Sequence, residues 1–388
     1  MEVLNRTAQL AEFIDEARSS AGPMALDMEF ERERTYRPIL QLVQLATRDR
    51  AVIVDPLEIQ DLGALWDLVA DPDVPVLFHA GRQDLEIFWH ESGGMIPHNL
   101  FDTQIAAALL GMGEQVGYAD LVRRLLDVHL KKGERTTDWG RRPLSDAQLQ
   151  YALDDVLYLH EVGDKLSAML EERDRTEWLR EEMEFYSDRG TWERSADELW
   201  TRISRHRSLS GKNLAVLREL AVWREETASR RNIPRNRVVA DDVLIDLAKR
   251  LPSTEADLGT LRRLHPREIE RSGNEILDAI DNGLNTPKEE WPRLPKMRED
   301  DSELNLAIDL LSTFVKIRGR EIQIATSYLG NKKDVTSFAY AHKAKRDRSD
   351  LALGHGWRYE LVGRDLERIL EGELDFAIND GRVVLRER

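Results

Sequence analysis

Strand-like runs end about halfway along this 388-residue chain, and that change constrains its fold more than any other feature. Before about residue 190, runs over residues 22–30, 38–47 and 51–55 alternate with amphipathic helical stretches, as is typical of an α/β domain. These three runs lie close enough together to form an antiparallel meander. Residues 74–80 predict a buried strand that leads into a helix.

Helical periodicity accounts for most of the remaining sequence. In the first half, helices are expected over residues 82–91, 103–110, 118–128 and 146–173. After about residue 190 the β signal disappears, and glycines or prolines separate helices of roughly 10 to 18 residues. The second half is therefore expected to be all-helical.

The chain is long enough for two or three domains, since a domain usually holds roughly 100 to 200 residues. Prolines and polar residues in segment 282–296 make a continuous helix improbable there. We predict an α/β domain over residues 1–190 and all-α domains over 191–285 and 295–388.

The composition excludes several kinds of chemistry and location. The chain has no cysteine, which rules out disulfides, thiolate metal sites and cysteine nucleophiles and favours a reducing, cytoplasmic setting. The amino end lacks the apolar core of a signal peptide, and no apolar run approaches the ~18 residues of a membrane span. A cytoplasmic protein without membrane contact is expected.

Charge is distributed unevenly along the chain. With 56 basic and 72 acidic residues, the net charge of −16 should repel a polyanion, so nucleic-acid binding must be local. Segment 194–237 is the basic exception, and its arginines suit contact with an RNA backbone, although solvated helix faces explain them equally simply. Trp200 and Trp223 are expected to form the core of this helical module.

Two acidic residues share one face of the first predicted strand. In MALDMEF, strand alternation places Asp27 and Glu29 on one face and Leu26, Met28 and Phe30 on the other. The two carboxylates repel each other unless water or a cation lies between them. An ordinary solvent-facing strand edge is the alternative interpretation.

Two further acids follow the next strands. Asp84 falls in the first turn of a predicted helix after Gly81, where the helix dipole alone would favour an acid. Asp102 stands where an N-cap is expected, which favours a structural role for it.

The last of these helices carries a phenol and a carboxylate on one face. Tyr151 and Asp155 are spaced i and i+4, whereas Asp154 is turned about 100° away. Taken with Asp27, Glu29 and Asp84, the pattern supplies four carboxylates and one phenol. Carboxylate oxygens suit hard cations such as Mg²⁺ or Mn²⁺, and a pair of such ions suits phosphoryl chemistry.

These motifs resemble those of the ribonuclease D family of DEDDy exonucleases. Residues 27–29 (DME), 79–84 (HAGRQD) and 151–155 (YALDD) resemble its three exonuclease motifs, and residues 135–144 (RTTDWGRRPL) resemble the stretch before the third. Residues after about 194 resemble a first HRDC domain, the helicase and ribonuclease D C-terminal module. Those after about 295 resemble a divergent second HRDC domain.

The resemblance implies a ribonuclease-H-like α/β catalytic domain followed by two all-α HRDC-type domains. It implies removal of 3′ extensions from transfer RNA precursors and other structured RNAs by two-metal-ion phosphodiester hydrolysis, with release of nucleoside 5′-monophosphates. The two ions would be Mg²⁺ or Mn²⁺. By position, Asp27 would bridge both metals, Glu29 and Asp155 would complete one site, Asp84 would serve the other, and Tyr151 would position the water.

Residues beside these motifs are candidates for substrate contact. Met28, Phe30 and His79 flank the acids and are expected either to pack against the terminal sugar and base or to belong to the core. Beside Trp139, Arg141 and Arg142 are expected either to contact phosphates or to be solvated.

Two other functions remain open at this stage. A DNA 3′–5′ exonuclease of proofreading type would use the same ligand set, but the helical half resembles ribonuclease D and no polymerase segment is evident. A non-catalytic RNA-binding protein would leave all five catalytic residue types idle. A monomer is expected, because three tethered domains already suffice to surround a substrate.

Overall fold

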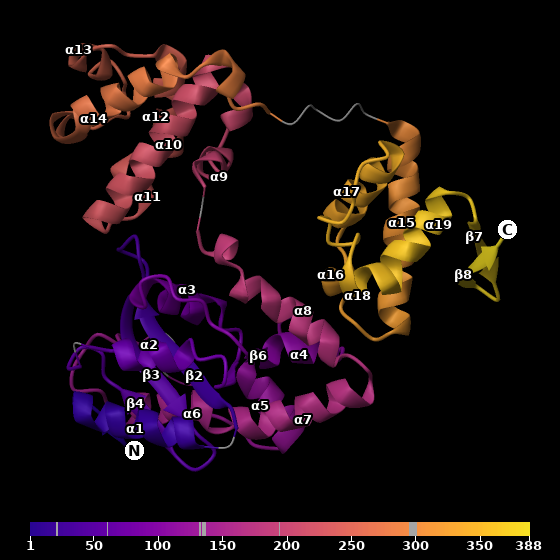
Figure 1. Ribbon diagram of the computed structural model, residues 1–388. Coiled ribbons are helices and arrows are strands. Elements are labelled where there is room, and N and C mark those ends of the chain that lie inside the picture. Colours follow the sequence, from indigo (N-terminus) through magenta and orange to yellow (C-terminus); the bar gives the residue numbers. More distant parts are fainter. Residues whose placement is uncertain (21, 60, 132, 134–136, 194, 295–300) are drawn as a thin grey trace.

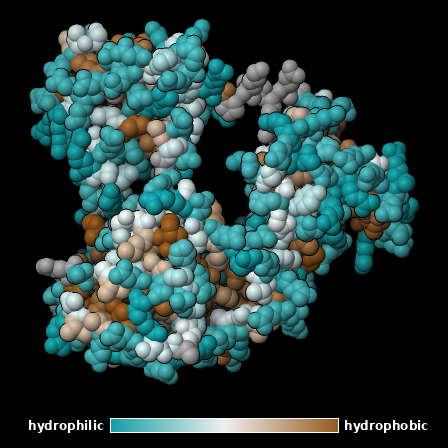
Figure 2. All heavy atoms as spheres, in the orientation of Figure 1, coloured by the Kyte–Doolittle hydropathy of each residue, from teal (hydrophilic) through white to brown (hydrophobic). Residues whose placement is uncertain are grey.

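The computed structural model describes residues 1–20, 22–59, 61–131, 133, 137–193, 195–294 and 301–388. These residues form three bodies, here called the first body (residues 1–193), the second body (195–294) and the third body (301–388) (Figure 1). The expected start of the last domain at residue 295, and that of the basic segment at residue 194, lie outside the described residues. In the space-filling view the three bodies are separate lobes with an opening between them (Figure 2).

The first body is built on a six-stranded mixed sheet with strand order β1-β4-β3-β2-β5-β6. The predicted meander is confirmed, since β2, β3 and β4 pair antiparallel, while β1, β5 and β6 pair parallel with their neighbours. A register shift between Glu29 and Phe30 marks an irregularity in the β2–β3 pairing. The strands are β1 (Val3–Leu4), β2 (Met24–Glu31), β3 (Ile39–Ala46), β4 (Ala51–Val54), β5 (Val76–Phe78) and β6 (Leu100–Asp102).

Helices cover both faces of this sheet. Phe13 of α1, Leu65 of α2 and Phe88 of α3 pack in the main core with Leu26 and Val43 of the sheet. The helix α6 covers the opposite face. The helices of the first body are α1 (Thr7–Ser19), α2 (Gly63–Val69), α3 (Arg82–Glu91), α4 (Thr103–Leu109), α5 (Tyr118–Leu126), α6 (Asp146–Leu157), α7 (Leu159–Glu172) and α8 (Thr176–Ser187).

The prediction of a single helix over residues 146–173 is wrong, because the helical conformation is interrupted between α6 and α7. Tyr158 has non-helical backbone angles (φ −103°, ψ 1°), and its amide donates to the hydroxyl of Tyr118 at 3.3 Å. At its start, α6 is fixed by a capping box between Ser145 and Gln148. These contacts define both ends of the helix that carries the third motif.

The second body is all-helical, as predicted. Trp200 and Trp223 lie in its core, which also confirms the prediction for these two residues. The two longest helices, α10 and α14, approach closely, since a Cβ at Gly283 would lie 2.4 Å from the Cα of Val216. Its helices are α9 (Ala196–Thr201), α10 (Lys212–Arg231), α11 (Arg235–Val238), α12 (Asp241–Arg250), α13 (Glu255–Leu258) and α14 (Pro266–Asn285).

The third body is helical except at its end, where the all-helical prediction is wrong. The last two strands form a hairpin around Asp380 and Gly381, whose φ angles are 47° and 74°. An Asp-Gly pair with two positive φ angles is the preferred two-residue hairpin turn. The elements are α15 (Ser302–Glu321), α16 (Thr326–Leu329), α17 (Lys332–Lys343), α18 (Gly356–Arg358), α19 (Arg364–Leu370), β7 (Leu374–Asn379) and β8 (Arg382–Glu387), with a short π-helix over Tyr359–Gly363.

The third body docks on α8 of the first body. The indole rings of Trp178 and Trp357 stack with centroids 5.0 Å apart. The carboxylate of Glu182 accepts hydrogen bonds from the indole of Trp357 at 3.1 Å and from Arg358 at 2.6 Å. The guanidinium of Arg175 donates to the carbonyl oxygens of Leu109 and Ile322, which belong to the two bodies.

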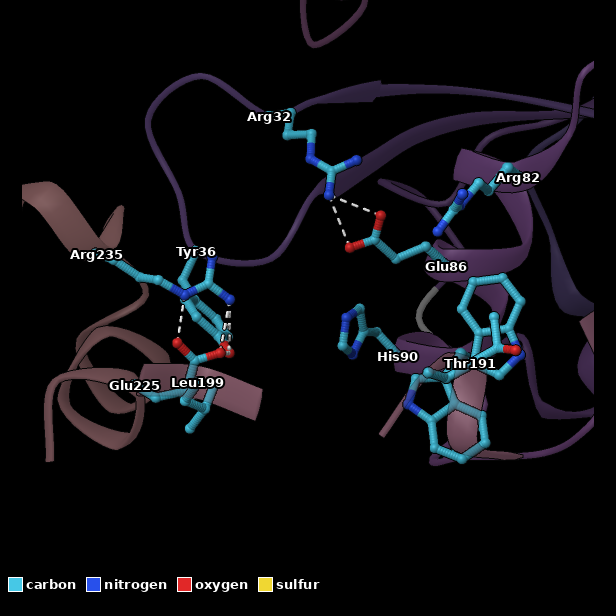
Figure 3. A pocket seen from close by; sticks show the side chains of 11 residues that line it. Arg32, Tyr36, Arg82, Glu86, His90, Thr191, Leu199, Glu225 and Arg235 are labelled. Atoms are coloured by element: carbon cyan, nitrogen blue, oxygen red, sulfur yellow. Dashed lines mark hydrogen bonds and ion pairs between the residues drawn. The ribbon is translucent and has the colours of Figure 1, made fainter. Parts of the chain in front are cut away.

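The second body docks on the loop between β2 and β3 (Figure 3). The hydroxyl of Tyr36 donates to Glu225 at 2.6 Å, and its ring lies 4.8 Å from the guanidinium of Arg235. The side-chain oxygen of Asn232, at the end of α10, accepts from the amides of Tyr36 and Arg37 at 3.1 Å each. This loop continues directly from β2 and so connects that strand to the second body.

None of the helices in the described part of the chain has the length and apolar content needed to cross a bilayer.

Replacing Trp357 by alanine should weaken the docking of the third body. Trp357 is 3% exposed, and truncating a buried tryptophan typically costs about 3–5 kcal/mol. Urea unfolding of Trp357→Ala measures the loss. Leu306→Ala is the control, because Leu306 is 63% exposed and should change stability by less than about 0.5 kcal/mol. Equal effects for the two variants would contradict the docking described here.

Candidate active site

Three carboxylates converge where β2 passes beneath α6. Asp27 and Glu29 lie on the face of β2 opposite Leu26 and Met28, as the alternation predicts. The α6 helix brings Asp155 to the same place. One carboxylate oxygen from each of Asp27, Glu29 and Asp155 lies within 4.8 Å of the others.

The fourth acid, Asp84, is placed beside this cluster by the turn between β5 and α3. Gly81 is required in that turn, because a Cβ there would lie 2.4 Å from the Phe78 ring. Asp84 follows in the first turn of α3 and is buried. It lies close enough for its charge to influence Asp27.

Asp102 has the structural role that the sequence predicts. Its carboxylate caps α4 by accepting hydrogen bonds from the amides of Gln104 and Ile105. It also accepts from the amide of Ala80 at 3.0 Å, a contact that the sequence does not predict. Because Ala80 has a left-handed backbone (φ 57°), Asp102 holds the turn that precedes Asp84.

Burial makes these carboxylates difficult to ionise together. Burial raises the pKa of Asp84 and that of Asp155 to about 7, with added repulsion from neighbouring acids. Burial raises the pKa of Asp27 well above its ordinary value, and repulsion from Asp84, Asp155 and Glu29 adds to this. Ionisation of all four groups therefore requires positive charge near them.

The donor set fits a divalent cation. Carboxylate oxygens are the ligands preferred by Mg²⁺ and Mn²⁺, and the close oxygens of Asp27, Glu29 and Asp155 offer several to one ion. A bound cation would also relieve the repulsion that raises the three pKa values. The acidic cluster is therefore suited to hold divalent metal.

Tyr151 lies one turn before Asp155 on α6. Its ring is half-buried, with its centroid 6.1 Å from that of Trp139. Asp154 is held differently, since its carboxylate accepts from Gln150 at 2.7 Å. Tyr151 and Asp155 lie one helical turn apart on α6, as their spacing predicts.

The three candidate substrate contacts beside the acids differ in exposure. Met28 lies in the main core, and Phe30 packs partly buried against it. His79 is held between the hydroxyl of Thr103 at 2.8 Å and the carbonyl of Val116 at 3.0 Å. Burial lowers the pKa of His79 to about 4, so the ring is neutral at pH 7. Met28 is buried, whereas Phe30 and His79 are each partly exposed.

The candidate substrate contacts that precede the third motif also differ in exposure. Trp139 is buried against Leu42 under α6. Arg142 donates to both carboxylate oxygens of Asp55, at 2.5 and 2.8 Å, and is therefore committed to a structural ion pair. Arg141 is exposed. Residues 135 and 136, which begin the RTTDWGRRPL stretch, lie outside the described residues.

Some basic residues of the second body's basic segment form ion pairs with acidic residues of the same body, and others do not. Arg224 pairs with Asp241, Arg231 with Glu268, Arg230 with Glu275 and Arg235 with Glu225. Other basic residues are exposed and have no ion-pair partner in the part of the chain that the structure describes: Arg202, Arg205, Arg207, Lys212 and Arg237.

The sequence analysis does not identify one polar residue that lies beside the acidic cluster. Gln44 is fully buried on β3, directly opposite Asp27 in the strand register. In the sequence, Gln44 differs from its neighbours in being a polar residue inside the apolar run PILQLVQLAT.

Comparison of the sequence with known proteins identifies matching family models and relatives. A family model described as 3′-5′ exonuclease matches residues 1–171, and the HRDC domain model matches residues 213–280. Ribonuclease D of Sphingobium indicum is 42% identical over 379 residues, which cover 96% of this chain and 95% of that relative. Ribonuclease D of Nitrobacter hamburgensis is 39% identical over 100% of both chains.

A solved structure has the same fold over nearly the whole chain. The crystal structure of Escherichia coli RNase D, described as an exoribonuclease involved in structured RNA processing, superposes with a TM-score of 0.84 at 29% identity. The match covers 96% of this chain and 98% of that one. The first body thus has the ribonuclease-H-like exonuclease fold and the second contains an HRDC domain, while an HRDC identity for the third is not confirmed. Because its relatives match over nearly their full lengths, the chain belongs to the ribonuclease D family.

Proposed function

We propose that this chain is a 3′–5′ exoribonuclease that hydrolyses phosphodiester bonds with divalent metal ions. The observation that carries the proposal is the convergence of Asp27, Glu29 and Asp155, with Asp84 beside them, within an exonuclease fold. Membership of the ribonuclease D family favours RNA as the polymer.

Two ions, Mg²⁺ or Mn²⁺, belong to this proposal. Asp27, Glu29 and Asp155 would hold one ion, and Asp27 with Asp84 would hold the second. When bound, such ions activate water and neutralise charge on the leaving oxygen. The closeness of the carboxylate oxygens of Asp27, Glu29 and Asp155 supports this assignment.

The remaining roles fall to groups around the cluster. Tyr151, on the face of α6 that carries Asp155, would orient the attacking water, and hydrolysis at the 3′ end would release nucleoside 5′-monophosphates. Arg82 is exposed two residues before Asp84, with its guanidinium 5.3 Å from the Phe185 ring. Together with the exposed basic residues of the second body, Arg82 would contact the upstream RNA backbone.

The proposal also covers the RNA substrates, the domain boundaries, the cellular location and the oligomeric state. Transfer RNA precursors with single-stranded 3′ tails, and other structured RNAs, would be trimmed until the duplex is reached. The domains would be those expected from the sequence, over residues 1–190, 191–285 and 295–388. The enzyme would act as a cytoplasmic monomer.

A time course on a 5′-labelled transfer RNA precursor with a short 3′ tail tests this function. In Mg²⁺ or Mn²⁺ a descending ladder should stop near the duplex and disappear with chelator. Asp155→Asn should abolish it, because an amide is a poor substitute for an ionised ligand oxygen. Degradation of a DNA strand of the same sequence but not of the RNA would overturn the proposal in favour of a DNA exonuclease.

Tyr151→Phe should reduce kcat without abolishing activity. Loss of a group that positions or deprotonates water typically costs ~10²–10⁴ in rate, whereas the ring still packs near Trp139. Single-turnover cleavage measures the change. A rate within twofold of wild type would show that the phenol is only structural.

The stability of metal-free protein should fall as pH rises from about 4 to 7. Asp84 and Asp155 have pKa values raised to about 7, so between about pH 4 and 7 the folded state binds more protons than the unfolded state and loses stability as they leave. Thermal unfolding in chelator should therefore give a lower Tm at pH 8 than at pH 5.5. Added Mn²⁺ should raise Tm more at pH 8.

Asp84→Asn is the matched control for this pH dependence. The amide cannot ionise, so the fall in Tm between pH 5.5 and 8 in chelator should be smaller than in wild type. An equal fall in the two proteins would contradict the assignment of the effect to this cluster.

A further inference from the structure

The buried side chain of Gln44 has no evident reason to be polar. Gln44 lies in the middle of β3 with 0% of its surface exposed. Neither its amide nitrogen nor its amide oxygen has a hydrogen-bond partner among the described residues. A buried amide without partners is unfavourable, because it loses its hydrogen bonds to water and gains none.

Apart from the acidic cluster, its surroundings are apolar. The same face of the sheet carries Ala25, Leu42, Ala46 and Ile53, which pack in two clusters with Ala152, Leu153 and Val156 of α6. A leucine or methionine would fill such a position at lower cost. The amide therefore requires an explanation other than packing.

The strand register supplies a partner. Gln44 is paired with Asp27 across β2 and β3, and residues paired in this way project from the same face with Cβ atoms roughly 4.5–5.5 Å apart. On its other side Gln44 is paired with the apolar Ile53. Of the two residues paired with Gln44 across the sheet, Asp27 is therefore the polar one.

Gln148 is a buried glutamine whose side chain is fully engaged. Gln148 is 8% exposed, and its side-chain nitrogen donates to Thr137 at 3.1 Å while its oxygen accepts from the amide of Ser145 at 2.9 Å. The same side-chain amide is thus satisfied where its role is structural. Among the buried glutamines that the structure describes, Gln44 has both side-chain atoms buried and unpartnered, whereas Gln41 lacks a partner for its oxygen.

We infer that Gln44 is a positioning residue for Asp27, donating a hydrogen bond from its side-chain nitrogen to the Asp27 carboxylate when that group is ionised and holds metal. This inference rests on the proposed function, which makes Asp27 the ligand shared by both ions. Hydrogen bonds to metal-ligating carboxylates fix their orientation, and an ionised oxygen is a stronger acceptor than a protonated one. A neutral amide donates without adding a positive charge that would compete with the cation.

Metal binding by Gln44→Met tests this inference without depending on activity. Methionine is similar in size to glutamine but cannot donate. Titration with Mn²⁺, followed by calorimetry and by the shift in Tm, should show affinity weakened by about 10- to 100-fold. The Tm in chelator should equal or exceed that of wild type, since a costly buried amide is removed. Gln41→Met, on the same strand, is the control and should bind Mn²⁺ as wild type does.

The outcomes separate the inference from the function on which it rests. If wild-type protein shows no Mn²⁺ binding, the proposed metal site itself fails. If wild type binds and Gln44→Met binds within twofold of it, only the role of Gln44 is overturned.

A measurement on wild-type protein covers the case in which Gln44→Met does not fold. With ¹⁵N-glutamine labelling, a side-chain NH₂ resonance should shift downfield on addition of Mg²⁺, as expected for a donor to an ionised carboxylate. If no glutamine side chain responds to Mg²⁺ at concentrations that raise Tm, the inference is overturned.

Discussion

Mutual repulsion among partly or fully buried carboxylates is the constraint on which this structure depends. Asp27, Asp84 and Asp155 come from a strand and two helices that are far apart in sequence, and each is held where burial raises its pKa. Such an arrangement destabilises the empty fold at neutral pH, so the rest of the first body must hold it in place. The repulsion that weakens the fold is also what makes the cluster bind cations strongly.

Local devices hold each acid in position. Gly81 and the Asp102–Ala80 hydrogen bond shape the turn before Asp84, while the capping box at Ser145 fixes the start of α6. The break at Tyr158 fixes the end of that helix. The second body docks on the loop that continues β2, and the third body docks on α8 of the first body (Figure 1).

Much of this arrangement follows from local sequence. The alternation in MALDMEF, the i and i+4 spacing of Tyr151 and Asp155 and the N-cap at Asp102 depend on neighbouring residues, and each is found in the structure as predicted. The hairpin around Asp380 and Gly381 also has a local signal, the Asp-Gly pair. The helical pattern of the preceding 180 or so residues nevertheless favours a helical prediction for the whole second half.

Features that depend on distant partners could not be predicted in this way. Arg142 is recognisable as an internal residue only once β4 brings Asp55 beside it, and His79 only once Thr103 and Val116 enclose it. The position of Gln44 opposite Asp27 requires the strand register, which the sequence does not specify residue by residue. Sequence reasoning therefore locates the acids, and the fold identifies the side chains that support them.

The central claim is that these carboxylates hold divalent ions at the 3′ end of RNA. Anomalous diffraction from a crystal grown with Mn²⁺ and a short single-stranded RNA tests it most directly. The account predicts two Mn²⁺ peaks, one contacting oxygens of Asp27, Glu29 and Asp155 and one contacting Asp27 and Asp84, with the terminal phosphate beside them. RNA bound elsewhere, or a saturated crystal with no Mn²⁺ at this cluster, would contradict it.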